Sequence, residues 1–189
     1  NKFISSLEFK LTLDQNKNIE EIIKDLNSDK KMLRLLHGDV GSGKTIVAII
    51  SALHVICSGY QVAFLVPTEI LANQHYHFIK EKLKKLNINV FLLTASTYNK
   101  KQIINNIKND KKSLVVGTHA LLQKNIIFKN LSYVIIDEQH RFGVNQRINI
   151  KNKGKKVDML LMSATPIPRT MLLANLGDIS VSTIKQKPF

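Results

Sequence analysis

One short segment constrains the fold of this 189-residue chain more than any other feature. It reads, in chain order, Gly38, Asp39, Val40, Gly41, Ser42, Gly43, Lys44 and Thr45. An apolar run at residues 33–37 precedes it, and a longer apolar run of helical period follows it. Glycines at this spacing let backbone amides converge on phosphate oxygens at the positive end of a helix. The segment therefore predicts a strand, a phosphate-binding loop and a helix in succession.

The last two residues of this loop suit a bound nucleotide. Lys44 can neutralise the charges of the β and γ phosphates, and the Thr45 hydroxyl can bind Mg²⁺. A glycine-rich turn with a purely structural role is the alternative, and the strand before the loop and the helix after it favour the phosphate loop.

Short β-branched runs alternate with longer segments of helical period along the chain. The runs lie at residues 33–37, 61–66, 89–93, 113–117, 133–137, 159–163 and 179–184. Several are apolar on both faces, which suits a parallel sheet buried between helices. The pattern predicts one α/β domain over residues 1–189, with a mostly parallel sheet sandwiched between helices. In such a fold, ligands bind beyond the carboxyl ends of the strands.

The run at residues 133–137 ends in two adjacent carboxylates. Asp137 and Glu138 follow four apolar residues and are themselves followed by Gln139 and His140. One carboxylate can hold Mg²⁺ while the next polarises a water toward the γ-phosphate. Together with the phosphate loop, the pair predicts metal-assisted phosphoryl transfer.

The charge and the apolar runs narrow the class of protein. A net charge of +14 favours a polyanionic partner such as nucleic acid, although a lysine-rich solvated surface is the alternative. The longest apolar run, residues 46–57, is shorter than the roughly 20 residues that cross a bilayer, so we expect a soluble protein without a membrane partner.

Cys57 is the one cysteine of the sequence and cannot form an internal disulfide, which fits a reducing compartment. Because the chain begins at Asn1 rather than at methionine, we expect a fragment of a longer chain.

Six ordered motifs carry a family resemblance. Their residues are Phe9 and Gln15; Lys44 and Thr45; Pro67, Thr68 and Glu69; Gly117, Thr118, His119 and Ala120; Asp137, Glu138, Gln139 and His140; and Ser163, Ala164 and Thr165. In this order they resemble the first RecA-like lobe of superfamily 2 helicases, and most closely the RecG type. The run Pro166-Ile167-Pro168-Arg169-Thr170 extends the similarity. Transcription-repair coupling translocases are a near alternative, but they usually carry Glu at position 139 and often Phe at position 42.

The resemblance implies a motor lobe of an ATP-dependent DNA helicase or translocase that remodels branched DNA at stalled forks, in recombination and repair. It implies ATP and Mg²⁺ as cofactors, and a cytoplasmic, nucleoid-associated location. The implied partners are branched or forked DNA, held by its backbone, and a second RecA-like lobe and a wedge domain of the same parent chain.

The resemblance also assigns roles to residues. It places Phe9 and Gln15 at the adenine, residues 38–45 around the phosphates, and Thr45 and Asp137 at the metal. The implied catalytic residues are Lys44, Asp137, Glu138 and His140. The residues implied to couple the nucleotide-binding site to the rest of the motor are Gln139, Ser163, Ala164 and Thr165. The implied DNA contacts are Pro67, Thr68, Glu69, Gly117, Thr118 and His119.

Several of these positions have other interpretations. Phe9 is also suited to core burial, and Thr68 and Thr118 are also suited to capping a helix. Ala95 stands where RecG-type proteins usually have glycine, which puts in doubt a close DNA contact there. His75 and His77 lie two residues apart on a helical pattern, and we expect surface or core positions rather than zinc ligands. The lysine clusters, among them Lys153, Lys155 and Lys156, are expected to be solvated.

Two other classes of protein remain as alternatives. A non-motor phosphate-loop enzyme such as a nucleotide kinase needs an arginine-rich lid, and the sequence has four arginines, Arg34, Arg141, Arg147 and Arg169. A nucleic-acid-binding module without catalysis would explain the charge. It would not need Lys44, Thr45, Asp137 and Glu138.

Overall fold

A single parallel sheet organises the computed structural model, which describes residues 2–5, 7, 9–165 and 179–186. Within these residues the sheet has seven strands in the order β3-β4-β2-β5-β6-β1-β7. Their bounds are β1 Leu33–Gly38, β2 Gln61–Leu65, β3 Asn89–Leu93, β4 Ser113–Gly117, β5 Leu131–Ile136, β6 Asp158–Ser163 and β7 Ser180–Ile184. Every neighbouring pair is parallel. The predicted α/β fold is therefore confirmed, and β5 begins two residues earlier than predicted.

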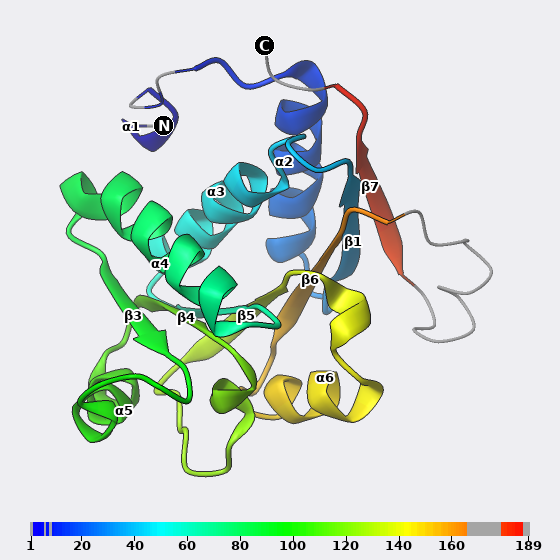
Figure 1. Cartoon of the computed structure of the whole chain (residues 1–189). Coiled ribbons are helices and arrows are strands. Elements are labelled where there is room, and N and C mark those ends of the chain that lie inside the picture. The colour runs from blue at the N-terminus through cyan, green and yellow to red at the C-terminus, as the bar shows by residue number, and fades with distance from the viewer. Residues whose placement is uncertain (1, 6, 8, 166–178, 187–189) are drawn as a thin grey trace.

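Helices cover both faces of this sheet (Figure 1). They are α1 Lys2–Ser5, α2 Leu13–Leu26, α3 Lys44–Cys57, α4 Glu69–Leu83, α5 Lys100–Asn109 and α6 Val144–Lys151, with short 3₁₀ turns η1 Lys84–Leu86, η2 His119–Leu122 and η3 Gln139–Arg141. Helices α2, α3 and α4 lie on one face and α5 and α6 on the other. No helix in the described part of the chain has the length and apolarity needed to cross a membrane.

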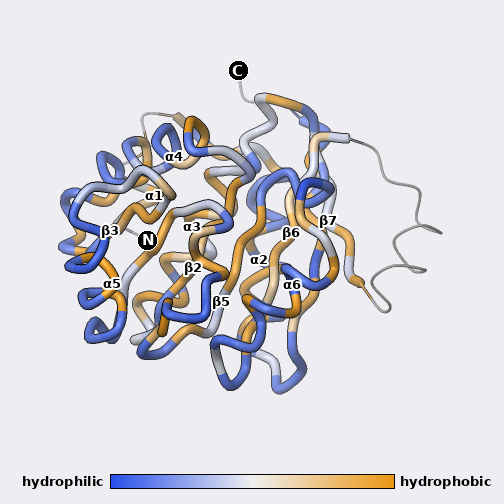
Figure 2. The backbone as a smooth tube through the Cα atoms, turned by 60° about the horizontal axis from the view of Figure 1, so that its bottom comes forward, coloured by the Kyte–Doolittle hydropathy of each residue, from blue (hydrophilic) through white to orange (hydrophobic). Residues whose placement is uncertain are grey.

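The alternation of side chains along each strand builds two cores. In β5, Tyr133 and Ile135 pack toward α3, and Val134 and Ile136 pack on the opposite face. Both sets are buried, because a parallel sheet covered by helices leaves neither face to water. The central strands are accordingly coloured as predominantly hydrophobic in Figure 2. The core holds the sheet edge, where the polar loops lie, in a fixed arrangement.

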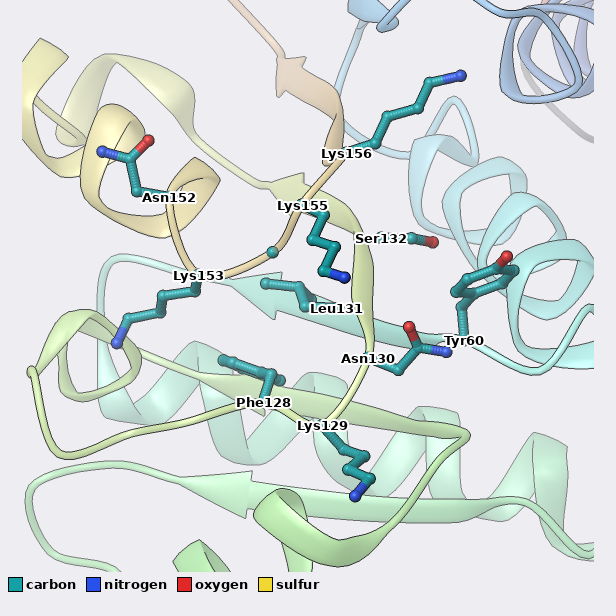
Figure 3. A pocket seen from close by; sticks show the side chains of 11 residues that line it. Tyr60, Phe128, Lys129, Asn130, Leu131, Ser132, Asn152, Lys153, Lys155 and Lys156 are labelled. Carbon is teal, nitrogen blue, oxygen red and sulfur yellow. The ribbon is translucent and has the colours of Figure 1, made fainter.

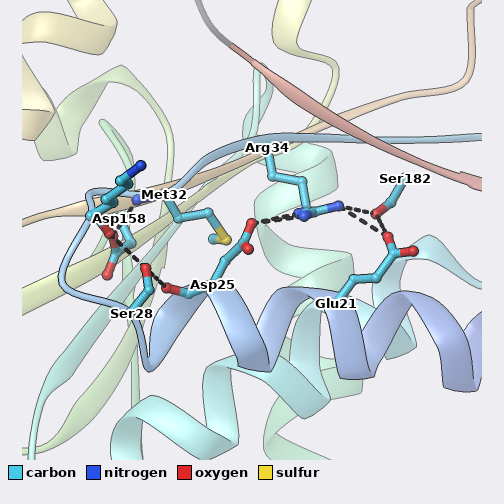
Figure 4. A network of polar contacts seen from close by, with 8 residues as sticks. Glu21, Asp25, Ser28, Met32, Arg34, Asp158 and Ser182 are labelled. Atoms are coloured by element: carbon cyan, nitrogen blue, oxygen red, sulfur yellow. Dashed lines mark hydrogen bonds and ion pairs between the residues drawn. The ribbon is translucent and has the colours of Figure 1, made fainter.

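A polar network fixes α2 beside β1 and β7 (Figure 4). The buried guanidinium of Arg34 donates to Asp25 at 2.8 and 3.0 Å, to Glu21 at 3.0 Å and to the Ser182 hydroxyl at 2.6 Å. Two carboxylates and a hydroxyl thus satisfy one buried charge, which a protein interior requires. The network joins α2 to the strand that leads into the phosphate loop.

A pocket lined by lysines lies at the amino ends of β5 and β6 (Figure 3), at the edge of the sheet opposite the carboxyl ends of the strands. Lys153 is partly buried here, and its ammonium group donates to the carbonyls of Gln123 and Ile126 at 2.7 and 2.8 Å. Lys156 donates to the Ser28 carbonyl at 2.9 Å. The expectation that this cluster is solvated is therefore wrong for Lys153, which holds a neighbouring loop, whereas Lys155 and Lys156 are exposed.

Candidate functional site

The order of the strands sorts the motif loops into two groups along the carboxyl edge of the sheet. Strands β5, β6 and β1 are neighbours, and the loops after them are residues 137–141, 163–165 and 38–45. We call these loops the P-loop half. Strands β2, β4 and β3 are also neighbours, and we call the loops after them, residues 66–69, 117–119 and 94–97, the α4 half. Because β2 pairs with β5, the two halves meet at that boundary.

The predicted phosphate loop connects β1 to α3, as expected. Gly43 has a φ of +85°, which is accessible to glycine at little cost. Gly38 needs its small size for another reason, since a Cβ there would come 2.6 Å from Ser42 Oγ and 3.0 Å from the Ile184 carbonyl. The loop therefore packs tightly between α3 and the end of β7.

Lys44 lies at the centre of the P-loop half. Its Nζ donates to the carbonyls of Gly38 and Asp39 at 2.5 and 2.9 Å. Burial lowers the pKa of Lys44, and the nearby carboxylates of Asp137, Glu138 and Asp39 oppose that shift. The lysine therefore lies near the acidic pair that follows β5.

The two residues predicted at the adenine differ in environment. Gln15 is 0% exposed; its Nε2 donates to the Ser42 carbonyl at 2.9 Å, and its Oε1 accepts from the Thr12 amide at 2.9 Å. The side chain therefore holds the phosphate loop and the start of α2 together. Phe9 is 39% exposed, so it is not the core residue of the alternative interpretation. Contact of either residue with adenine stays a prediction.

The acidic pair follows β5 in a tight turn. The Asp137 amide donates to the Leu65 carbonyl at 2.9 Å, which continues the pairing with β2. Glu138 has a φ of +50°, a left-handed conformation that costs a non-glycine residue on the order of 1 kcal/mol. Its amide donates to Asp137 Oδ1 at 2.9 Å, and its carboxylate lies 3.4 Å from His140 Nδ1. Strained backbone held by local contacts is a common feature of catalytic turns.

His75 also contacts Asp137, a contact that no local sequence pattern predicts. Its Nε2 lies 3.3 Å from Asp137 Oδ2, and its ring packs against Phe64 with centroids 4.9 Å apart. His75 thus lies at the edge of the core, which is one of the two expected positions, and it also borders the acidic turn. The sequence signal was weak, because nothing relates the helical position of His75 to a loop about 60 residues further along the chain.

The residues predicted for coupling lie close to the acidic pair in the sheet order. Gln139 is buried, and its Oε1 accepts from Arg147 Nη1 at 3.2 Å; burial lowers the pKa of Arg147. Ser163 is buried at the end of β6, and its hydroxyl lies 3.0 Å from the Thr165 hydroxyl. Ala164 lies between them. Strand β6 separates β5 from β1, so this hydroxyl pair ends a strand that borders both the acidic turn and the phosphate loop.

The run of residues 166–170 that extends the resemblance lies outside the described residues.

In the α4 half, Thr68 caps α4 and Glu69 holds a neighbouring loop. The Thr68 hydroxyl accepts from the Leu71 amide at 3.3 Å, so the capping role is present. The Glu69 carboxylate accepts from the amides of Ala95 and Ser96 at 2.8 and 3.2 Å and also from the Ser96 hydroxyl. The bond from the Ser96 hydroxyl, with those from the two amides, lowers the pKa of Glu69. Glu69 therefore binds the loop that contains Ala95.

The remaining residues of the α4 half follow β2 and β4. Pro67 precedes Thr68 in the loop after β2, and Gly117 ends β4. Thr118 is buried and stands before η2, but its side chain makes no capping hydrogen bond there. His119 stacks on Phe142 with centroids 4.8 Å apart, and its Nε2 lies 3.2 Å from Gln146 Oε1. His119 thereby links the loop after β4 to the segment that follows the acidic turn.

The donor set of the P-loop half fits a magnesium ion. The Thr45 hydroxyl and the Asp137 carboxylate are hard oxygen ligands, which Mg²⁺ prefers. Mg²⁺ commonly binds through one or two carboxylates together with substrate phosphates and water, so a larger cluster of protein ligands is not required.

Known proteins resemble this chain in sequence and in fold. Residues 12–173 match the family model described as DEAD/DEAH box helicase. The chain is 56% identical, over 99% of its length, to the ATP-dependent DNA helicase RecG of Borreliella burgdorferi, and 54% identical, over 99%, to that of Aquifex aeolicus. It spans 28% and 24% of those two relatives. A solved structure of RecG bound to a three-way DNA junction matches 98% of the chain with a TM-score of 0.84 and 51% identity, and the match covers 25% of that protein.

Proposed function

Because the chain belongs to the DEAD/DEAH box helicase family, we propose that it is the ATP-binding motor lobe of a RecG-type DNA helicase, within a longer parent protein. The observation that carries the proposal is the convergence of the phosphate loop, the Asp137-Glu138 turn and the Ser163-Thr165 pair on three neighbouring strands. The 56% identity to a RecG relative over almost the whole chain supports the choice within the family. Gln139 and Ser42 favour this type over the transcription-repair coupling translocases.

The geometry supports a division of labour in ATP hydrolysis. The amides of the phosphate loop and the ammonium of Lys44 hold the β and γ phosphates. Glu138 orients the attacking water and polarises it, and the neighbouring His140 lies 3.4 Å from its carboxylate. Thr45 and Asp137 are the residues that would hold Mg²⁺. When bound, the ion would neutralise charge that develops on the phosphate oxygens.

DNA binding belongs to the α4 half in this proposal. Thr68, Thr118 and the amides near them can bind backbone phosphates, which carry no sequence information. The net charge of +14 favours such binding. Branched or forked DNA as the substrate, a second RecA-like lobe and a wedge domain as partners in the parent chain, and a cytoplasmic, nucleoid-associated location complete the proposal.

The test uses the full-length protein that contains this chain. We expect ATP hydrolysis that DNA stimulates, and unwinding of a synthetic three-way junction that requires ATP and Mg²⁺. Binding to unrelated base sequences should be equal and should weaken steadily as salt rises, because counterions are released from the phosphates. Hydrolysis that is indifferent to DNA, or a marked preference for one base sequence, would contradict the proposed function.

A further inference from the structure

Helix α4 connects the two halves of the carboxyl edge. It begins at Glu69, directly after Thr68, in the α4 half. His75 lies six residues further on, about 9 Å along the helix axis. There, its Nε2 is 3.3 Å from Asp137 Oδ2, which belongs to the P-loop half. One rigid element thus has one end among the proposed DNA contacts and a side chain against the acidic turn.

The contact between His75 and Asp137 is enclosed. Their side chains are 14% and 16% exposed. The imidazole lies between the Asp137 carboxylate and the ring of Phe64, which is completely buried in β2. A ring packed in this way has little freedom to turn, so its position follows that of the helix that carries it.

The other polar side chains near the middle of α4 are turned elsewhere. His77 is exposed and meets Tyr76 edge-on at 5.3 Å. Asn73 donates to the Glu69 carbonyl of its own helix at 2.8 Å. Among the described residues of α4, His75 is the one with a polar contact to the loop after β5.

We propose that His75 is a positioning residue that couples DNA-backbone binding at the start of α4 to the placement of the Asp137 carboxylate. The inference rests on the function proposed above. A phosphate bound by Thr68 and the first-turn amides shifts α4 as a body, because a helix transmits displacement along its axis. His75 moves with the helix and carries the Asp137 oxygens with it. Nucleotide binding and DNA binding then influence each other reciprocally, as any linkage between two sites requires.

The experiment measures that linkage in the full-length protein. The dissociation constant of a fluorescent, non-hydrolysable ATP analogue with Mg²⁺ is determined without DNA and with saturating forked DNA. The ratio of the two constants is the coupling factor, which for linked sites is typically about 5- to 150-fold. His75→Leu keeps an apolar body against Phe64 and removes the ring nitrogens. We expect its coupling factor to fall toward one, a loss of about fivefold or more.

Two further variants make the result specific. His75→Gln keeps an N–H group on a side chain of similar reach, and we expect it to retain most of the coupling. His77→Leu makes the same change as His75→Leu at an exposed position of the same helix, and its coupling factor should stay within about twofold of the wild-type value. A loss of stability alone would not separate these three variants in this way.

The outcomes are distinct. Unchanged coupling in His75→Leu, or an equal loss in His75→Gln, would overturn the role of His75. If His75→Leu does not fold, His75→Met takes its place, since methionine is close to glutamine in shape and has no N–H group. A wild-type protein with neither coupling nor DNA-stimulated hydrolysis would refute the proposed function itself, whereas normal wild-type coupling that persists in the variant refutes this inference alone.

Discussion

The P-loop half and the α4 half of the carboxyl edge are held in place by different kinds of contact. In the P-loop half, buried polar side chains hold the elements together. Gln15 joins the phosphate loop to α2, and the Arg34 network joins α2 to β1 and β7. In the α4 half, the contacts between loops are partly or fully exposed, as for the bonds between Glu69 and the amides of Ala95 and Ser96.

This difference has a physical consequence. Hydrogen bonds shielded from water restrict a loop strongly, whereas exposed bonds compete with water and open at low cost. The P-loop half is therefore preorganised for a ligand whose geometry must be exact during phosphoryl transfer. The α4 half can adjust to a DNA backbone, which offers many equivalent phosphates.

The largest effect is expected in the P-loop half, from the substitution Glu138→Gln. The amide can still form hydrogen bonds, so nucleotide binding should persist, but it cannot polarise the water as a carboxylate does. We expect the kcat for ATP hydrolysis by the full-length protein to fall by about 100-fold or more. Glu81→Gln, an exposed change on α4, is the control. Turnover within a few-fold of the wild type would place the catalytic base elsewhere.

The next effect is expected from Lys44→Ala, which removes the principal positive charge of the loop. Bonds to charged groups contribute about 1.5–3 kcal/mol, so affinity for an ATP analogue should fall by roughly 10- to 100-fold in calorimetric titration. The loop also loses the bonds to the Gly38 and Asp39 carbonyls, but Gln15 still holds it, and the fold should persist. Unchanged affinity in a folded variant would remove the phosphate-loop assignment.

A moderate effect on stability is expected from Arg34→Met. The change leaves Glu21 and Asp25 without their shared cation and Ser182 without a donor. Breaking a fully buried pair costs about 3–5 kcal/mol, but these carboxylates remain 36% and 30% exposed, so we expect about 2 kcal/mol. Urea unfolding of the 189-residue chain measures it. Arg141→Met, at an exposed arginine, should change stability little, and equal effects would contradict the proposed anchoring of α2.

The smallest effect concerns Glu69 and depends on pH. Its pKa is lowered by the bonds from Ser96 and Ala95, so these bonds favour the ionised carboxylate. Their contribution is fully present above the ordinary pKa of a glutamate and is lost as the pH falls through the lowered value. Hydrogen exchange at the Ala95 and Ser96 amides should accelerate relative to neighbouring amides over that range. Glu69→Gln should abolish this pH-dependent step, and a step that survives in the variant would assign it to another group.

Much of the fold followed from local patterns. The seven runs of apolar and β-branched residues correspond to the seven described strands, and the five inner strands are almost wholly buried, as such runs favour. The phosphate loop was also predictable, because its glycines, its lysine and its threonine all lie within eight consecutive residues. The acidic pair was predictable as well, since its position at a strand end is itself a local feature.

The partners of these residues depended on the order of the strands, which no local pattern encodes. Local sequence patterns were enough to predict that Asp137 lies at the end of a buried run and that Thr68 precedes a helix. Only the tertiary structure placed β5 beside β2, so that His75 of the helix after β2 lies against Asp137. The tertiary structure likewise placed Gln15 against the phosphate loop and Glu69 against the loop that contains Ala95. Contacts between side chains distant along the chain arise only when the whole sheet and its helices pack together. No single segment of the sequence determines that packing.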